Sequence, residues 1–285
     1  MAGFTSVGAY ADAHEVGQTF YSTWRKSPSQ VSVAGVWTDL SMSPGSPLPN
    51  YYASAPLVSA TLSGAAGIRH GGNVAPASKH LHRFMALSGG SAALPLYSVL
   101  LDYLLYYPFI DMGITEDQPM NDAVPLPRYA DGEGVRIMAV ITNPPSAPIG
   151  LTFTIDYVNQ AGESKTTPTN SFGIGTTSGS LATTDRAVAN LSGPFVRLAS
   201  GDSVRSITAF RMTGALDVGL LALVLVKPIA THSLRSIDAP VEVDYLTAGS
   251  VLPEIEDGAY LNLITCPSAS LVGTAIVGDI TTVWS

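Results

Sequence analysis

The sequence predicts an all-β protein, an antiparallel β-sandwich of the jelly-roll kind with at most one or two short helices. Short apolar runs follow one another at regular spacing from residue 134 to the end of the chain. Turn-forming residues, such as residues 143–145 and 159–162, separate these runs. The first 79 residues are rich in Gly, Ser, Ala and Pro, which excludes long helices there. Short strands with turns between them are typical of sandwiches and barrels.

Residues 1–79 are expected to form an extended N-terminal arm with short strands, and residues 80–285 the sandwich domain. The arm is punctuated by Pro28, Pro44, Pro47, Pro49 and Pro56. Each proline removes a backbone donor and restricts the residue before it. Within the arm, residues 30–37 alternate with period two, which predicts one half-buried strand.

Residues 94–107 leave two alternatives open. A helical face is fitted by Val99, Leu100, Tyr103, Leu104 and Tyr107. The same apolar and aromatic content suits a buried strand equally well. Periodicity does not decide between helix and strand, and Pro108 ends the element in either case.

The later part of the chain yields a series of expected strands. They cover residues 135–142, 151–158, 195–198, 204–211, 220–226, 241–246, 259–265 and 270–277. Residues 153–162 are the clearest hairpin, because an alternating run ends in a loop closed by glycine. Residues 166–184 contain mainly Ser, Thr and Gly, which predicts a long flexible loop. The apolar run 219–226 is too short to span a bilayer and predicts a buried central strand.

The charge balance argues against nucleic acid as a partner. The 285 residues include 14 Lys and Arg against 22 Asp and Glu, a formal net charge of −8. Phosphate binding requires clustered cations, so we expect neither nucleic acid nor a membrane as a partner. Only 13% of the residues are charged. So few charges predict apolar surface that a partner covers.

Catalytic motifs are missing from the sequence. It contains no Gly-x-Ser-x-Gly elbow, no phosphate-binding Gly-x-x-x-x-Gly-Lys loop and no His-Glu-x-x-His zinc helix. We therefore expect a protein that is not an enzyme and that has no cofactor. Cys266, the single cysteine, is expected to be a buried, inert thiol.

Two charged regions contain residue types that can bind metal ions. His80 and His82, with His70 upstream, could place two imidazoles on one strand face, but further ligands at a recognised spacing are missing. Residues 79–83 are better interpreted as a basic patch that docks on acidic residues, including those of another subunit. The acidic stretch 111–133 lacks the spacing of a calcium loop and is expected to be solvated and to form a salt bridge with Arg128. No metal site is expected.

Aromatic residues of the arm are candidates for subunit contacts, since aromatic side chains contribute much of the energy of protein interfaces. For Tyr51 and Tyr52 two alternatives stay open: packing on their own domain or anchoring on a neighbour. The candidate interface residues are Trp24, Trp37, Tyr51, Tyr52, His80 and His82.

Several segments of the sequence resemble virion structural proteins of tailed double-stranded-DNA bacteriophages. They are residues 102–111 (DYLLYYPFID), 126–135 (LPRYADGEGV), 157–162 (YVNQAG), 194–202 and 222–228, with 39–45 and 49–53 in the arm. The resemblance extends over residues 36–284 and includes no catalytic motif.

The resemblance implies a capsid decoration or cement protein. Such a protein binds the outer surface of the head and stabilises it by bridging neighbouring subunits. Its implied partners are the major capsid protein and copies of itself, as a homotrimer, and its location is the virion. The alternatives are a tail or head fibre component that contacts the host, or an enzyme of assembly or wall degradation, which the missing motifs disfavour.

Overall fold

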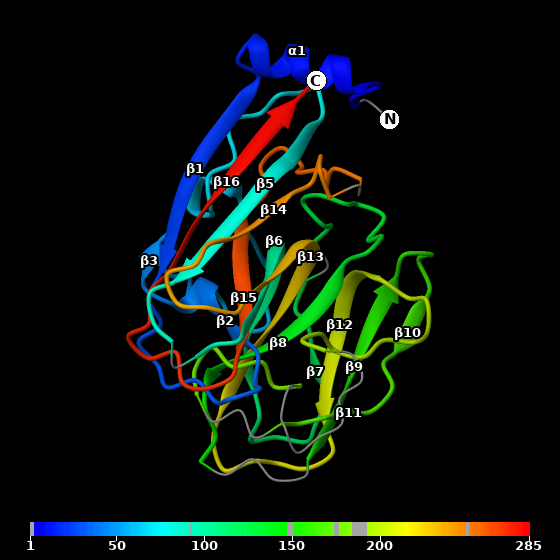
Figure 1. Cartoon of the computed structure of the whole chain (residues 1–285). Coiled ribbons are helices and arrows are strands. Elements are labelled where there is room, and N and C mark those ends of the chain that lie inside the picture. Colours follow the sequence, from blue (N-terminus) through cyan, green and yellow to red (C-terminus); the bar gives the residue numbers. More distant parts are fainter. Residues whose placement is uncertain are drawn as a thin grey trace.

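The computed structural model describes residues 3–91, 93–122, 124–146, 151–173, 177–183, 193–248 and 251–285. Strands account for 42% of the residues and helices for 6%, and every strand pair is antiparallel. The predicted all-β sandwich class is therefore confirmed. One α-helix, α1 (Val7–Glu15), lies at the end of the molecule where both termini are found (Figure 1).

The first sheet, called the terminal sheet below, contains both ends of the chain. Its strand order is β14-β5-β16-β1-β3. The strands are β1 (Thr19–Lys26), β3 (Gly45–Ser46), β5 (Lys79–Ser88), β14 (Val241–Asp244) and β16 (Ile276–Trp284). Because β1 pairs with β16 along its whole length, the N-terminal segment is part of the sandwich.

The second sheet, called the central sheet, has the order β2-β15-β6-β13-β8, and β4 also pairs with β6. Its strands are β2 (Thr38–Asp39), β4 (Ala60–Thr61), β6 (Leu96–Asp111), β8 (Arg136–Asn143), β13 (Leu220–Leu234) and β15 (Leu261–Pro267). The 16-residue β6 and the 15-residue β13 run side by side through most of the molecule (Figure 1).

The third sheet has the order β10-β9-β12-β7, and β11 also pairs with β9. Its strands are β7 (Gln118–Pro119), β9 (Thr152–Asn159), β10 (Ser164–Thr166), β11 (Asn170–Ser171) and β12 (Val204–Met212). Two short 3-10 turns, Leu40–Met42 and Gly64–Ala66, complete the elements.

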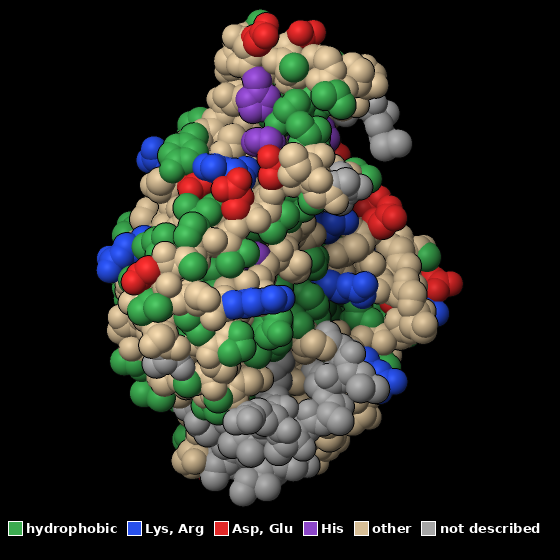
Figure 2. Space-filling model, viewed as in Figure 1, with side chains coloured by type: hydrophobic (Ala, Val, Ile, Leu, Met, Phe, Trp, Pro, Cys, Tyr) green, Lys and Arg blue, Asp and Glu red, His purple; other side chains and the backbone are tan. Residues whose placement is uncertain are grey.

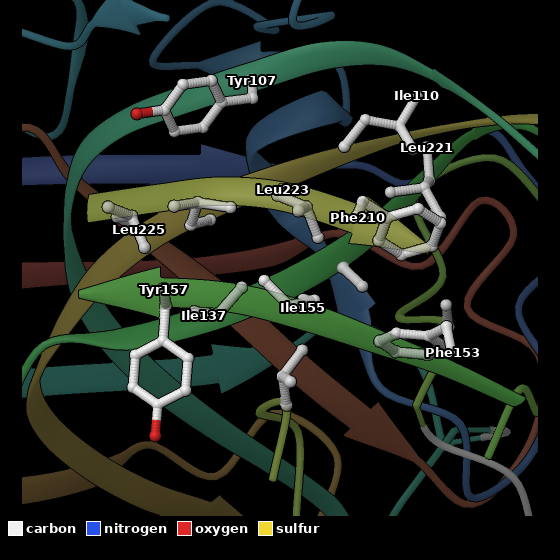
Figure 3. Close-up of a cluster of buried hydrophobic side chains, with 14 of the residues drawn as sticks. Tyr107, Ile110, Ile137, Phe153, Ile155, Tyr157, Phe210, Leu221, Leu223 and Leu225 are labelled. Atoms are coloured by element: carbon white, nitrogen blue, oxygen red, sulfur yellow. The ribbon is translucent and has the colours of Figure 1, made fainter. Parts of the chain in front are cut away.

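The central sheet belongs to two sandwiches at once. Along β13, Leu221, Leu223 and Leu225 enter a core that the third sheet closes with Phe153 and Tyr157 (Figure 3). Further along the same long strands, a second core is closed by side chains of the terminal sheet, including Trp24, Phe84 and Ile280. The alternate residues Ala222, Val224 and Val226 pack on the other side in a third core, with Tyr52, Leu62 and Tyr103.

Burial of both faces explains why residues 94–107 were ambiguous. Nearly every residue of β6 is buried, so the strand shows no alternation of apolar and polar side chains. The segment is a strand, and the helix alternative is wrong. The expected end at Pro108 is also wrong, because β6 continues through Pro108 to Asp111.

Most of the expected later strands are present, with shifted ends. The hairpin of residues 153–162 is confirmed as β9 and β10, with Gly162 at a φ of 81° in the turn. Residues 195–198 do not form a strand, and β16 begins only at Ile276. The predicted loop 166–184 includes β11, and Leu181 donates a backbone hydrogen bond of 2.8 Å to Trp37. Residues 174–176 and 184 of that loop lie outside the described residues.

The expectation of an extended arm over residues 1–79 is corrected by these pairings. Strand β1 lies inside the terminal sheet, and β2 and β4 pair with strands of the central sheet. The strand expected over residues 30–37 is absent, and β2 begins only at Thr38. The boundary at residue 79 coincides with the start of β5, which pairs with β16 in the same sheet as β1. The partner of β1 lies at the opposite end of the sequence, which local composition does not reveal.

Candidate contact surface

Two of the candidate interface residues are core residues. Trp24 packs against Phe84, with ring centroids 6.3 Å apart, and a Cβ atom added at Gly278 would come within 2.5 Å of the Trp24 ring. Tyr52 is also buried, and its ring meets Tyr106 edge to face at 5.0 Å. The assignment of Trp24 and Tyr52 as interface anchors is therefore wrong for this chain, because their own sandwich covers both rings.

Tyr52 belongs to a buried polar network centred on Asp39. Its hydroxyl donates a hydrogen bond to the Asp39 carboxylate, and Tyr103 and Ser41 donate two more, each 2.7 Å long. Burial raises the pKa of Asp39, although these hydrogen bonds act in the opposite direction. The network ties the segment after β2 to the central strand β6.

A buried lysine fixes the next part of the same segment. The Lys26 ammonium donates hydrogen bonds to the Ser43 carbonyl at 3.2 Å and to the Pro47 carbonyl at 2.8 Å. Burial lowers the pKa of Lys26 to about 8, and the charge of Asp39 acts in the opposite direction. The Lys26 side chain of β1 thus fixes the backbone of residues 43–47 through these two hydrogen bonds.

Tyr51 is the candidate that points outward. Its side chain is 60% exposed, whereas that of Tyr52 is 1% exposed. The backbone of Tyr52 has a φ of 52°, in the left-handed region that non-glycine residues seldom adopt. Two adjacent tyrosines thus have opposite environments: Tyr52 anchors the segment inside, and Tyr51 remains at the surface.

Tyr51 borders a small cavity of about 90 Å³. Apolar groups of Pro28, Val31 and Met42 and several hydroxyl-bearing residues also line it. The floor includes Asp39, whose carboxylate is already hydrogen-bonded, and the buried Thr38, whose hydroxyl has no hydrogen-bond partner among the described residues. The cavity can accept a small uncharged group.

Trp37, another candidate interface residue, is half-buried and packs against the third core.

His80 and His82 lie at the opposite end, beneath helix α1. The Tyr10 hydroxyl and His82 Nδ1 share a hydrogen bond, and the His14 and His82 rings are 5.2 Å apart. Burial raises the pKa of Tyr10 to about 12 and lowers that of His82. His80 contacts Phe4, with centroids 5.8 Å apart. Both histidines are half-buried and hold the helix on its own chain.

The basic segment 79–83 also finds its acidic partners within the chain. Lys79 is buried and lies 3.1 Å from Asp257, and Arg83 lies 2.7 Å from Asp279. His70 Nε2 donates to the Ala259 carbonyl at 2.9 Å, and burial lowers the pKa of His70 to about 4. Docking of this segment on another subunit is therefore not needed to satisfy its charges.

Arg128 does not pair with the acidic stretch that surrounds it in the sequence. Its guanidinium forms two hydrogen bonds, of 2.8 and 2.7 Å, with Asp102 in the middle of β6. It also donates to the carbonyl groups of Leu62 and Tyr103. The expected salt bridge to residues 111–133 is corrected, because Asp102 is buried and requires the cation.

Metal-binding groups, membrane-spanning helices and the single cysteine were the remaining features to locate in the described residues. They contain no group of three or more His, Cys, Asp or Glu side chains that could hold a metal ion. Within the same ranges, no helix has the length and hydropathy to cross a membrane. Cys266 is partly buried, and burial raises the pKa of its thiol.

Comparison with known proteins identifies no match for the chain. No protein-family model, curated protein or solved structure matches it. The arrangement of its own residues therefore has to support any assignment of function.

Sequence reasoning missed the Asp39 network. A signal was present, because Asp39 is the only charged residue between positions 27 and 68. A lone carboxylate in an uncharged segment is a good candidate for a buried, hydrogen-bonded group.

Proposed function

We propose that this chain is a bacteriophage capsid decoration or cement protein. It binds the outer surface of the head and stabilises it by bridging neighbouring subunits. Its partners are the major capsid protein and copies of itself, in a homotrimer, and it is located in the virion. The observation that best supports this role is the exposed Tyr51 on a segment that Asp39, Tyr52 and Lys26 hold in place.

A fixed surface suits this role better than a loose arm would. Residues 19–26, 38–39 and 45–46 are strands of the sandwich, so little chain has to become ordered when a partner binds. Association costs less entropy when the contact residues are preorganised. In this proposal the whole sandwich acts as a rigid plate, and bridging results from side chains at its surface.

The charge of the chain agrees with a position on the outside of the head. The formal net charge of −8 is unfavourable next to packaged DNA and compatible with an outward-facing surface. The sequence also lacks catalytic motifs, which is consistent with a mechanical role.

Mass spectrometry of purified virions from the phage that encodes the chain tests the proposal. A decoration protein should approach the copy number of the major capsid protein. A handful of copies per particle would instead indicate a fibre component. Absence from virions would contradict both roles.

Binding to heads that lack the protein gives the second test. Tyr51→Asp should weaken binding at least tenfold, because it places a charge in the contact between neighbouring copies on which bridging depends. Tyr21→Asp is the matched control: Tyr21 is 57% exposed, on β1 in the terminal sheet. Equal loss of binding in both variants would contradict a specific role for Tyr51.

A further inference from the structure

One end of the molecule presents no exposed charged side chain among its described residues. It is built from residues 27–56, 89–97, 177–183 and 266–275, together called the neutral end. These four segments contain one charged residue, Asp39, which is buried. In Figure 2, the lower left of the view shows hydrophobic and other uncharged side chains, whereas acidic side chains lie at the top over α1.

Backbone contacts join the four segments into one surface. The Gly273 amide donates to the Pro28 carbonyl at 3.1 Å, and the Gly35 amide to the Pro267 carbonyl at 2.7 Å. The Ser268 amide donates to the Ala93 carbonyl at 3.0 Å. The Asp39 amide reaches the Gly179 carbonyl at 2.7 Å. Segments far apart in the sequence are thus fixed side by side.

Large apolar side chains project from this surface. Their exposed fractions range from 47% to 78%, and they belong to Val31, Leu48, Tyr51, Tyr97 and Val272. Val31 and Tyr51 line the same cavity, and exposed apolar groups that lie together indicate a contact site. The cavity beside Tyr51 adds a recess that could accept one small side chain of a partner.

The net charge of the chain limits where two copies can bind each other. A chain of net charge −8 repels its own copies wherever carboxylates would meet. The neutral end avoids this repulsion, because its described residues present no exposed carboxylate. The buried Lys26 lies beneath it, and exposed cations lie at its border. They are Arg25 beside Ser46, Arg69 in a pocket that Leu48 also lines, and Arg235 directly after the pair of Leu234 with Leu96.

We propose that the neutral end is the surface through which one copy of this chain binds a second copy. This inference deepens the proposed function, which expects contacts between copies, but its test needs no phage head. A stable contact buries about 1,000 Å² or more in total, and the apolar side chains of two copies supply the centre of such a contact.

Sedimentation velocity of the full-length protein tests the inference. Between about 1 and 100 µM, the wild type should associate, as micromolar binding requires. Association should persist when NaCl rises from about 0.05 to 1 M, because the described residues of the neutral end present no exposed charge to screen. Tyr97→Asp and Val272→Asp should each weaken association at least tenfold, and Tyr21→Asp should leave it unchanged.

Melting temperatures show whether each variant is folded, since all three substitutions are at exposed positions. A wild type that stays monomeric over the whole range would overturn the inference. Loss of association at high salt would also overturn it. So would a Tyr21→Asp variant that dissociates as much as Tyr97→Asp and Val272→Asp. If the wild type is monomeric and Tyr97→Asp abolishes binding to heads, the neutral end faces the capsid protein, and contact between copies is excluded. Absence from virions tests the proposed function separately.

Discussion

Arg128 and Asp102 form an ion pair in the interior, joined by two hydrogen bonds between the guanidinium and the carboxylate. The Asp102 carboxylate also accepts a hydrogen bond of 2.9 Å from the Tyr260 amide. The pair therefore connects the loop around residue 128 with β6 and with the start of β15. Removing either residue of the pair would leave the other as an uncompensated charge in the interior, which lowers the free energy of unfolding.

Arg128→Ala should lower the free energy of unfolding by about 3 to 5 kcal/mol, because it leaves a buried carboxylate without its cation. Denaturant titration measures the change. Arg211→Ala is the control, since the pair of Arg211 with Asp117 is exposed and should contribute much less. Similar losses in both variants would show that Asp102 finds other compensation.

Tyr52→Phe removes one hydroxyl from the Asp39 network and should cost about 1 to 3 kcal/mol of stability. Tyr51→Phe changes only an exposed hydroxyl and should leave stability within about 0.5 kcal/mol. The same denaturant titration compares the two neighbours. Equal effects would argue against the opposite environments that the structure gives them.

Acid should destabilise the fold through buried neutral histidines. Burial lowers the pKa of His232 from 6.5 to about 4. As the pH falls from 6.5 toward 4, the unfolded chain takes up a proton that the folded chain does not. Stability is therefore lost in this window, by about 3 kcal/mol in full for a shift of this size.

His232→Leu should flatten this dependence between pH 7 and pH 4.5, because leucine does not titrate. Stability at pH 7 should change little, since both ring nitrogens of His232 lack hydrogen-bond partners in the described structure. Thermal melts at several pH values measure the slope. Parallel curves for wild type and variant would exclude His232 as the source.

Tyr10→Phe should loosen α1 without affecting the sandwich. The helix is attached through a small cluster of Tyr10, Ala13 and Val283 and through the hydrogen bond between Tyr10 and His82. Loss of one hydrogen bond, about 1 kcal/mol, should speed amide exchange in the helix about fivefold. Hydrogen exchange by mass spectrometry measures this, and slow exchange in β16 serves as the internal control.

Periodicity predicted the fold class and most later strands, because a strand such as β9 buries one face and its residues alternate accordingly. It left β6 undecided because both faces of that strand are buried. The role of residues 1–79 was mispredicted because β1 pairs with β16, about 250 residues away.

The contact residues show a similar limit. Composition alone does not separate Tyr51 from Tyr52, because what distinguishes Tyr52 is its left-handed backbone and its long-range hydrogen bond to Asp39. The partner of Arg128 was mispredicted because Asp102 lies within an apolar run, far from the acidic stretch. The uncharged segments were visible in the sequence, but their union into one surface depends on long-range hydrogen bonds.

Strands β6 and β13 are shared by both sandwiches, and this has a mechanical consequence. Neither half can rotate against the other without bending the two longest strands of the protein. The molecule therefore lacks a hinge along these strands. A force applied at one end of the molecule would be transmitted to the other end along the paired strands β6 and β13.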